Sequence, residues 1–416
     1  MQMHITNKEK ILKRKLLTDH TSISSEIEKN LENKLWNDVL PELPKGTLLV
    51  GGYIRDIILG RLNRKPDIDL IVPINPMIIA EKIVEKSNAK LIVLDKKRNI
   101  LRLIFDLFIL DISKQVGGSI LEDLSSRDFT INAIAFSLDS KLLIDPLNGI
   151  NDLHNGIIKT QKMKNILDDP LRILRCFRFI SELNFRVDEK LIDFITINKD
   201  KLNSISGERI QYELRKIFKG VNALTTILFI NEIKMFDWSQ SYQNISSTFL
   251  QSINYEETNL FAINEHKILF YLVETLEQSS IKKFKFSKTD NLNSIVLRKW
   301  KEKLTIKSIE KFNELERFYL HKELEEILPS FIAYLPERLH SDWLNRWRNE
   351  KDRLFHPKNF ISGESVKKHI NIKDGPLLGK LLSHLSIEFA YHRINNFDEA
   401  IFKAQQWFEQ NAPKCD

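Results

Sequence analysis

Two aspartates stand two residues apart in a short apolar stretch, and they are the residues best placed to do chemistry. Asp67 and Asp69 lie in the segment DIDLIV, shortly after the segment LLVGGYIRDIILGR at residues 48–61. Alternate side chains of a strand point to the same side, so both carboxylates are expected to project into one small volume. Two like charges this close are costly unless a cation lies between them. Mg²⁺ prefers such oxygen ligands and often shares them with substrate phosphates.

A glycine turn precedes this acidic strand. Gly51 and Gly52 allow the backbone to approach an anion closely, and the helical turn at 53–59, which ends at Gly60, offers its positive N-terminal end. Arg55 in that turn can add a charge-assisted hydrogen bond to a phosphate. A lone pair of aspartates in a glycine-rich hairpin would be a solvated turn in most proteins. The glycines, the arginine and the two aspartates together indicate a triphosphate and metal site.

Secondary structure of two kinds is expected around this site. Short apolar segments alternate with helical periodicity up to Pro146, which predicts an α/β unit on a mixed sheet. After Pro146 helical periodicity dominates to the end of the chain, so the overall class is α+β. An amphipathic helix is expected at 24–40, capped by Ser24 or Ser25. Besides the acidic strand, the expected elements are strands at 48–50, 91–94, 101–104, 108–112 and 142–144 and a helix at 76–85.

The pattern GGYIRDIILGR followed by DIDL resembles the head-domain signature of the class II tRNA nucleotidyltransferases, a family of the polymerase beta superfamily. Residues 122–135 resemble the family's second motif. That resemblance implies that Arg127 contacts substrate phosphate and Asp128 contacts the ribose hydroxyls, although Ser126 stands where the family usually has arginine. A third carboxylate commonly lies on a neighbouring strand in the superfamily, and Asp111 occupies the matching place. The alternative for Asp111 is a strand-end carboxylate that faces water.

A line of arginines follows the sequence Asp-Asp-Pro at residues 168–170. Arg172, Arg175 and Arg178 share one face of the expected helix, which is a solvated face in most proteins. Here the stretch resembles the family's nucleotide-selecting motif, which implies that these arginines and Asp169 bind substrate. Asp169 and Arg172 can present an acceptor beside a donor fork. Cytosine and adenine match that order, whereas uracil and guanine present the opposite order.

Composition limits the class of protein. A chain of 416 residues predicts two to four domains, and its formal net charge of +7 suggests a polyanionic partner such as nucleic acid. No apolar run approaches eighteen residues, so no membrane span is expected. Only two cysteines occur, which fits a reducing compartment. The cytoplasm is the expected location, although the basic N-terminus leaves an organelle address open.

The resemblance implies a division into four parts. They are an N-terminal helical extension at 1–46, a catalytic nucleotidyltransferase head at 47–150, a nucleotide-selecting helical neck at 151–220, and a helical body and tail at 221–416 that binds tRNA. Basic and aromatic residues mix in that last part, for instance at 282–288. They are compatible with RNA-backbone contact and equally with a solvated face.

The expected activity is template-independent addition of C and/or A residues to the 3′ end of tRNA from CTP and ATP, which makes or repairs a CCA or CC end. Asp67 and Asp69 are expected to hold two Mg²⁺ ions that activate the 3′-hydroxyl and brace the triphosphate. Only ten residues separate Asp111 from Glu122, and relatives with such a short loop are typically CC-adding. The alternatives are a poly(A) polymerase, a small-molecule nucleotidyltransferase and a catalytically altered RNA-binding relative. The sequence leaves the oligomeric state open.

Overall fold

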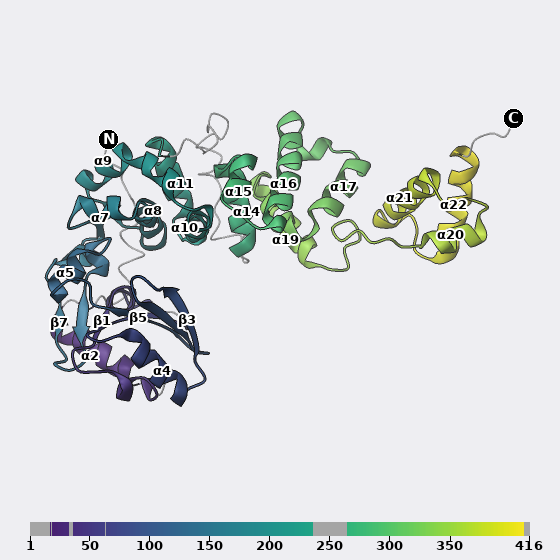
Figure 1. The fold of residues 1–416 in the computed structure, drawn as a ribbon. Coiled ribbons are helices and arrows are strands. Elements are labelled where there is room, and N and C mark those ends of the chain that lie inside the picture. Colours follow the sequence, from purple (N-terminus) through teal and green to yellow (C-terminus); the bar gives the residue numbers. More distant parts are fainter. Residues whose placement is uncertain (1–16, 18, 33–35, 63, 236–263, 412–416) are drawn as a thin grey trace. The chain divides into compact units, whose positions relative to one another are not determined.

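A seven-stranded mixed sheet carries the acidic strand at its centre (Figure 1). The strand order is β3-β4-β5-β2-β1-β6-β7; β2 runs parallel to β5, and the other neighbouring pairs are antiparallel. The strands are β1 (Leu48–Val50), β2 (Asp67–Val72), β3 (Lys90–Asp95), β4 (Ile100–Ile104), β5 (Ile109–Lys114), β6 (Ala135–Ser137) and β7 (Leu143–Ile144). Because β2 is a central strand, the positions of its two aspartates are set by neighbours on both sides.

The computed structural model describes residues 17, 19–32, 36–62, 64–235 and 264–411. The chain divides into two units, Met1–Thr226 and Ile227–Asp416. The first unit contains the sheet and the helices that follow it, and the second is helical in its described part. This is the α+β class expected from the sequence.

Helices on the sheet are explained by their local sequence. Helix α4 (Pro76–Lys86) starts with Asn75, whose side chain accepts from the Met77 amide at 3.1 Å, and has proline at its first position. It buries Ile79 and Ile83 and packs against β3, β4 and β5. The other helical elements of this region are α2 (His20–Leu31), the 3₁₀ turn Leu40–Glu42, α3 (Gly52–Ile58), α5 (Ile120–Ser125), the 3₁₀ turn Thr130–Asn132 and α6 (Gly149–His154).

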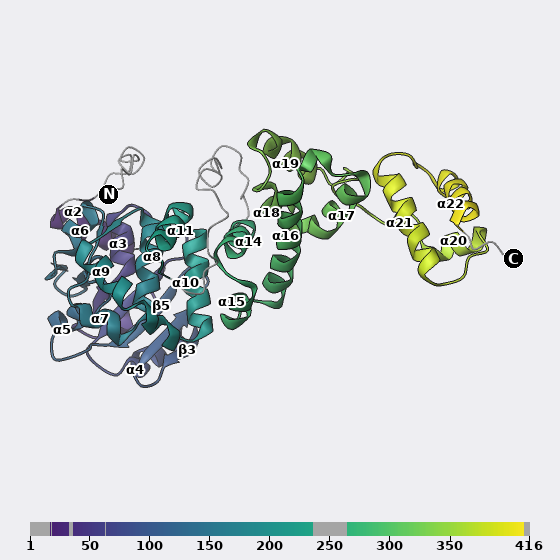
Figure 2. The ribbon, with the colours of Figure 1, turned by 90° about the horizontal axis from the view of Figure 1, so that it is seen from above.

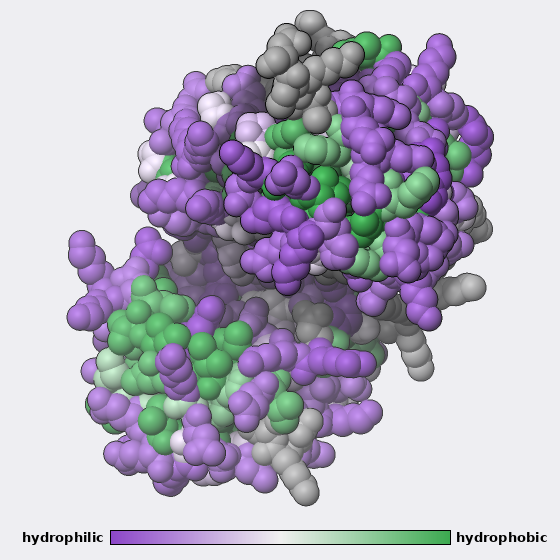
Figure 3. Space-filling view, turned by 90° about the vertical axis from the view of Figure 1, so that its right-hand side faces the viewer, coloured by the Kyte–Doolittle hydropathy of each residue, from purple (hydrophilic) through white to green (hydrophobic). Residues whose placement is uncertain are grey.

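The edge strand β3 leaves Val93 and Leu94 exposed, and Figure 3 shows hydrophobic side chains gathered on the lower body, the sheet region. The neighbouring strands β4 and β5 each bury one face, and Leu101 and Leu103 of β4 and Leu110 of β5 lie in the core. The alternation of buried and half-buried residues along β4 and β5 follows the two-residue period of a strand.

A helical layer completes the first unit. Helix α8 (Leu171–Leu183) packs along α10 (Gly207–Lys219), and Figure 2 shows the two next to each other. The face predicted to be apolar is buried, including Ile173, Cys176 and Phe177. The remaining elements are the paired strands β8 (Ile157–Ile158) and β9 (Arg186–Val187), α7 (Met163–Asp168), α9 (Glu189–Ile197), the 3₁₀ turn Lys199–Ser204 and α11 (Ala223–Glu232), which reaches the boundary between the units.

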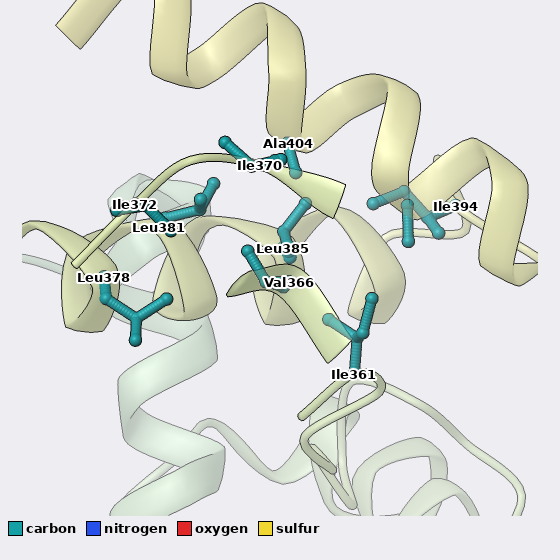
Figure 4. Packing of buried hydrophobic residues seen from close by; sticks show 10 residues of the cluster. Ile361, Val366, Ile370, Ile372, Leu378, Leu381, Leu385, Ile394 and Ala404 are labelled. Atoms are coloured by element: carbon teal, nitrogen blue, oxygen red, sulfur yellow. The ribbon is translucent and has the colours of Figure 1, made fainter. Parts of the chain in front are cut away.

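The described part of the second unit is built from helices and 3₁₀ turns. Its last three helices enclose a small core in which Val366, Leu381 and Leu385 are fully buried (Figure 4). No helix among the described residues is long and apolar enough to cross a membrane. The helices are α14 (Asn264–Thr275), α15 (Gln278–Lys283), α16 (Lys288–Ile306), α17 (Glu314–Leu324), α18 (Leu328–Ile332), α19 (His340–Arg348), α20 (Gly363–His369), α21 (Pro376–Ala390) and α22 (Phe397–Asn411), with 3₁₀ turns at Ile309–Lys311, Glu325–Ile327 and Glu337–Leu339.

Most predicted elements are present, but the first helix has other ends, and the short strands β6, β8 and β9 were not predicted. The helix expected at 24–40 starts at His20, because the side chain of Asp19 accepts from the Ser22 amide at 2.8 Å and caps it. That helix ends at Leu31, so its predicted ends are both wrong. Strand β6 was not predicted, because its sequence is too short to show strand periodicity.

Candidate active site

The two aspartates of β2 lie beside a third carboxylate. The strand register pairs Asp69 with Val50 of β1 on one side and with Asp111 of β5 on the other. Because the side-chain period of a strand is two, Asp67 and Asp69 point to the same side, as predicted. All three carboxylates line one cavity of about 830 Å³. The parallel pairing of β2 with β5 therefore brings together residues more than forty positions apart in the chain.

Every residue that the sequence analysis predicted for the site lines this cavity. It lies within the first unit, between the sheet and helices α8 and α10. The nominated residues that line it are Gly51, Gly52, Arg55, Asp67, Asp69, Asp111, Arg127, Asp128, Asp169, Arg172, Arg175 and Arg178. Their clustering is a structural fact, whereas the role of each in binding or catalysis remains a prediction.

Asp69 lines the cavity at a position where burial disfavours its ionised form. Burial raises the pKa of Asp69 to about 6; Arg127 opposes this, and the charges of Asp111 and Asp67 add to it. A cation at Asp67 and Asp69 would compensate the ionised pair, so these two residues fit a divalent metal. In the described part of the chain, no group of three or more His, Cys, Asp or Glu residues is arranged to hold a metal ion.

The glycine turn is required by close packing against Asp69. Gly51 has φ +78°, a conformation that favours glycine. A Cβ atom there would stand 3.1 Å from Oδ2 of Asp69 and 3.3 Å from Nη1 of Arg127. The Gly51 amide donates to the carbonyl of Ile134 at 3.2 Å, so this N–H is already engaged. The glycine thus gives Asp69 and Arg127 room.

Arg55 forms part of the cavity floor. Its Nη1 donates to Oδ1 of Asn132 at 2.6 Å, and its Nε donates to Oδ1 of Asp56 at 3.1 Å. Asn132 in turn donates from Nδ2 to Oδ1 of Asp128 at 3.0 Å. The phosphate contact that the sequence suggested for Arg55 would have to share a guanidinium that already holds this chain of hydrogen bonds.

Asp128 is buried and held in its ionised form. Nε of Arg175 donates to its Oδ2 at 2.7 Å, and the Phe129 amide donates to its Oδ1 at 2.8 Å. Burial acts to raise the pKa of Asp128, but the charge of Arg175 and the hydrogen bonds from Asn132 and Arg175 outweigh it and set the pKa at about 2. Asp69 and Asp128 therefore line one cavity with opposite pKa shifts.

Arg127 and Arg172 are oriented by neighbouring acceptors. Arg127 lies 3.3 Å from Oδ1 of Asp123, four residues earlier in the chain. Arg172 donates from Nη1 to the backbone carbonyl of Ser126 at 2.9 Å and to that of Asn165 at 3.2 Å. Ser126, at the place where the family usually has a second arginine, thus contributes through its backbone.

The other two arginines of α8 have acidic partners that the sequence analysis did not find. Arg175 and Arg178 lie 3.9 Å and 3.5 Å from the carboxylate of Glu213 on α10, and Arg178 also pairs with Glu182 at 3.0 Å. Burial raises the pKa of Glu213, and the two guanidiniums oppose that rise. The partner at i+4 of Arg178 could have been read from helical spacing, whereas Glu213 required the packing of α8 on α10.

Asp169 faces a different arginine from the one predicted to act with it. Its Oδ2 accepts from Nη2 of Arg209 at 2.8 Å, and its Oδ1 accepts from the Leu171 amide at 3.3 Å. Helix α8 starts at Leu171, with Pro170 at the N-cap. In this conformation Asp169 and Arg172 line the same cavity, but each is hydrogen-bonded elsewhere.

The fold and the cavity define a nucleotidyltransferase head joined to a helical region, and comparison with known proteins agrees. Residues 47–159 match the family described as Poly A polymerase head domain. The chain is 29% identical over 396 residues to the CC-adding tRNA nucleotidyltransferase of Synechocystis sp., covering 88% of this chain and 94% of that protein. It is 31% identical over 190 residues to the CC-adding tRNA nucleotidyltransferase of Shouchella clausii, covering 44% of this chain and 47% of the relative.

Solved structures share the fold. The Thermotoga maritima CCA-adding enzyme complexed with tRNA superimposes with a TM-score of 0.70 and 23% identity, covering 94% of this chain and 99% of that one. A CCA-adding enzyme in complex with CTP gives the same TM-score of 0.70 and the same identity of 23%, covering 95% of this chain and 99% of that one. The head-domain match and the similarity over 88% of the chain confirm the resemblance to the class II tRNA nucleotidyltransferases that the motifs indicated.

Proposed function

We propose that this protein adds nucleotides to the 3′ end of tRNA without a template, and that it adds two C residues from CTP efficiently and the terminal A from ATP poorly. The single observation that carries the proposal is one cavity lined by both the aspartate pair of β2 and the arginine face of α8. Similarity to a CC-adding tRNA nucleotidyltransferase over 88% of the chain supports the choice of substrate. The reaction releases pyrophosphate as the RNA 3′-oxygen bonds to the α-phosphorus of the incoming nucleotide.

Asp169 and Arg172 are proposed to choose the base. A carboxylate that accepts from the cytosine N4 amino group, beside a guanidinium that donates to N3, fits cytosine and rejects uracil. A mismatched base would leave buried polar groups without partners, at about 1–3 kcal/mol each. Because Asp169 is paired with Arg209 in this conformation, base binding must share or displace that ion pair.

Arg127, Arg175 and Arg178 are proposed to attract the triphosphate, and Asp128 to accept hydrogen bonds from the ribose hydroxyls. The low pKa of Asp128, about 2, keeps this carboxylate ionised and therefore an acceptor at neutral pH. A hydrogen-bonded 2′-hydroxyl gives a physical reason to choose ribonucleotides over deoxyribonucleotides. Arg55 is proposed to support Asp128 through Asn132 and to add positive charge beneath the phosphates.

Asp67 and Asp69 are proposed to hold Mg²⁺. Asp111, on the neighbouring strand β5, is proposed as the third catalytic carboxylate. The metal would supply the charge that neutralises the triphosphate and lowers the pKa of the attacking hydroxyl. The protein's own contribution is to fix the backbone positions of the two carboxylates on a central strand, which pairs with β1 on one side and with β5 on the other. No protein general base is required.

The restriction to two C residues rests on the segment between Asp111 and Glu122. It forms the end of β5, a turn at Gly117-Gly118 and the first turn of α5. The Gly118 amide donates to Oε2 of Glu122 at 2.7 Å, which closes this turn tightly. A segment this short has little reach to remodel a pocket from cytosine to adenine. Two proteins named CC-adding tRNA nucleotidyltransferase match 88% and 87% of this chain.

The roles of the four parts of the chain are also part of the proposal. Residues 47–150 would carry the chemistry, 151–220 would select the nucleotide, and 221–416 would bind tRNA through the basic residues of the helical unit. Residues 1–46 would be a helical extension of the head. The proposed location is the cytoplasm, because the two cysteines of the chain fit a reducing compartment.

The test is incorporation of labelled nucleotides into a tRNA that lacks its CCA end. The wild-type protein is expected to incorporate CMP and to exclude UMP and GMP, and Asp67→Ala and Asp69→Ala are expected to retain less than about one hundredth of that activity because both metal ligands are needed. Asp106→Ala is the matched control, since Asp106 is an exposed turn residue outside the cavity. Binding of tRNA should stay within a few-fold for all three variants.

Two results would contradict the proposal. Long A tails made from ATP on any RNA would identify a poly(A) polymerase. Absence of incorporation with every nucleotide, despite intact tRNA binding, would identify a catalytically altered RNA-binding relative.

A further inference from the structure

The third carboxylate of the cavity, Asp111, forms an ion pair with Arg102 on the next strand. The register pairs Arg102 of β4 directly with Asp111 of β5. Nε of Arg102 donates to Oδ1 of Asp111 and Nη2 donates to Oδ2, both at 2.8 Å. This is the bidentate arrangement in which a guanidinium fork matches a carboxylate. Both residues line the cavity, and Asp111 is the register partner of Asp69.

The fork leaves Asp111 poorly available as a metal ligand. Each of its two oxygens already accepts a charged hydrogen bond, and a positive charge stands beside it. This agrees with the finding that the described residues contain no group of three acids, histidines or cysteines placed to hold a metal. Among the residues that the structure describes, no arginine holds Asp67 or Asp69 in such a fork, so the aspartate pair differs from Asp111 in its access to a cation.

Stability of the sheet does not require this ion pair. The side chains of Arg102 and Asp111 are 35% and 20% exposed, and ion pairs at such partly exposed sites contribute about 0–1 kcal/mol. Strands β4 and β5 are also joined by five register pairs and by the buried side chains of Leu101, Leu103 and Leu110. A function in the cavity therefore explains the fork better than a function in folding.

We propose that Arg102 is a positioning residue that holds Asp111 apart from the metal-binding pair Asp67 and Asp69 until substrate arrives. The inference rests on the proposed function, since it assigns the metal to that pair. Arg102 lines a cavity built to receive a triphosphate and an RNA end, and a phosphate group can take over its guanidinium. Asp111 is then released beside Asp69. In the protein without substrate, Arg102 keeps the number of available carboxylates at two.

The test measures Mn²⁺ binding to the full-length protein without nucleotide or RNA, by electron paramagnetic resonance of free Mn²⁺. Arg102→Gln removes the fork and one positive charge, so Mn²⁺ affinity is expected to rise about tenfold as Asp111 becomes a ligand. Asp111→Asn alone is expected to leave the affinity unchanged. The double variant Arg102→Gln/Asp111→Asn is expected to lose most of the gain, because the released carboxylate is absent.

Two further variants separate the fork from general electrostatics. Arg98→Gln removes an equal charge from the cavity rim at a side chain that is 71% exposed, and is expected to change the affinity less than twofold. Asp69→Asn should abolish the specific site and so defines the background. Melting temperatures of all variants report any purely structural effect.

The proposal is overturned if Arg102→Gln binds Mn²⁺ no more tightly than wild type, or if Asp111→Asn alone weakens binding about tenfold, since Asp111 would then already be a ligand. Equal gains for Arg98→Gln and Arg102→Gln would also overturn it. Incorporation of CMP by the wild-type protein is measured separately. If the protein incorporates CMP but its variants do not show the expected Mn²⁺ affinities, only the proposed role of Arg102 is disproved. If it incorporates no nucleotide, the proposed function is disproved.

Discussion

Replacement of Asp69 by asparagine is expected to stabilise the metal-free protein. The pKa of Asp69 is about 6 in the folded state, compared with an ordinary value of 3.8, so the ionised carboxylate is about 2 units less favourable in the fold than in the unfolded chain. At about 1.4 kcal/mol for each unit, ionised Asp69 costs about 3 kcal/mol of folding free energy at pH 8. Asparagine keeps the shape and removes the charge. The melting temperature should rise by several degrees, at about 2–4 °C per kcal/mol for a unit of this size.

The pH dependence gives the sign of the effect. A carboxyl group with a raised pKa in the fold destabilises the protein fully above about pH 6, and this penalty is relieved as the pH falls from about 6 to 3.8. The melting temperature of Asp69→Asn, relative to wild type, should therefore be highest at pH 8 and should converge with wild type near pH 4–5.

Asp128 has the opposite effect on stability. Its pKa of about 2 contributes about 2–3 kcal/mol of stability above pH 3.8, which is lost as the pH falls toward 2.

The assay is differential scanning calorimetry in EDTA at several pH values between 5 and 8, with Asp128→Asn as the contrasting variant and Asp106→Asn as the exposed control. Asp69→Asn should melt higher than wild type at pH 8, Asp128→Asn lower, and Asp106→Asn at the same temperature. Added Mg²⁺ should stabilise wild type and leave Asp69→Asn unchanged. If Asp69→Asn melts lower than wild type at pH 8, the electrostatic account of the cavity is wrong.

Two further predictions concern base choice and packing. Arg172→Ala should lower the preference for CTP over UTP, measured as the ratio of kcat/KM values, by more than it weakens triphosphate binding; an unchanged ratio would remove Arg172 from base selection. Gly149→Ala should destabilise the protein by about 1–3 kcal/mol, because the new Cβ would stand 2.2 Å from the carbonyl oxygen of Thr130. Gly379→Ala, where nothing lies within 4 Å of the new Cβ, should instead stabilise helix α21 by about 0.5–1 kcal/mol, and equal unfolding free energies for the two variants would contradict the steric argument.

Local spacing was sufficient to relate five residues of the cavity to one another. Asp67 and Asp69 are related by the two-residue period of a strand, and Arg172, Arg175 and Arg178 by the turn of a helix. Each of these relations holds within one element, so it can be read without knowing how elements pack. The same reasoning predicted most strands of the sheet and the helical character of the remainder.

Partners that come from other elements could not be read in this way. Glu213 reaches Arg175 and Arg178 only because α10 packs on α8, and Arg209 reaches Asp169 for the same reason. The fork between Arg102 and Asp111 depends on the register of β4 on β5, and a shift of one residue would point one of them to the opposite face. These contacts decide which charges are compensated, and so they decide the pKa values of the site.

The most direct test of the central claim is the length of the product made on a tRNA that lacks its CCA end. The purified protein is incubated first with CTP alone and then with CTP and ATP together, and the products are separated at single-nucleotide resolution. The account predicts rapid addition of two C residues in both reactions and little addition of a terminal A, because the segment between Asp111 and Glu122 closes as a tight turn. Rapid conversion to the full CCA end would contradict the restriction to CC addition, and failure to add any C would contradict the proposed activity itself.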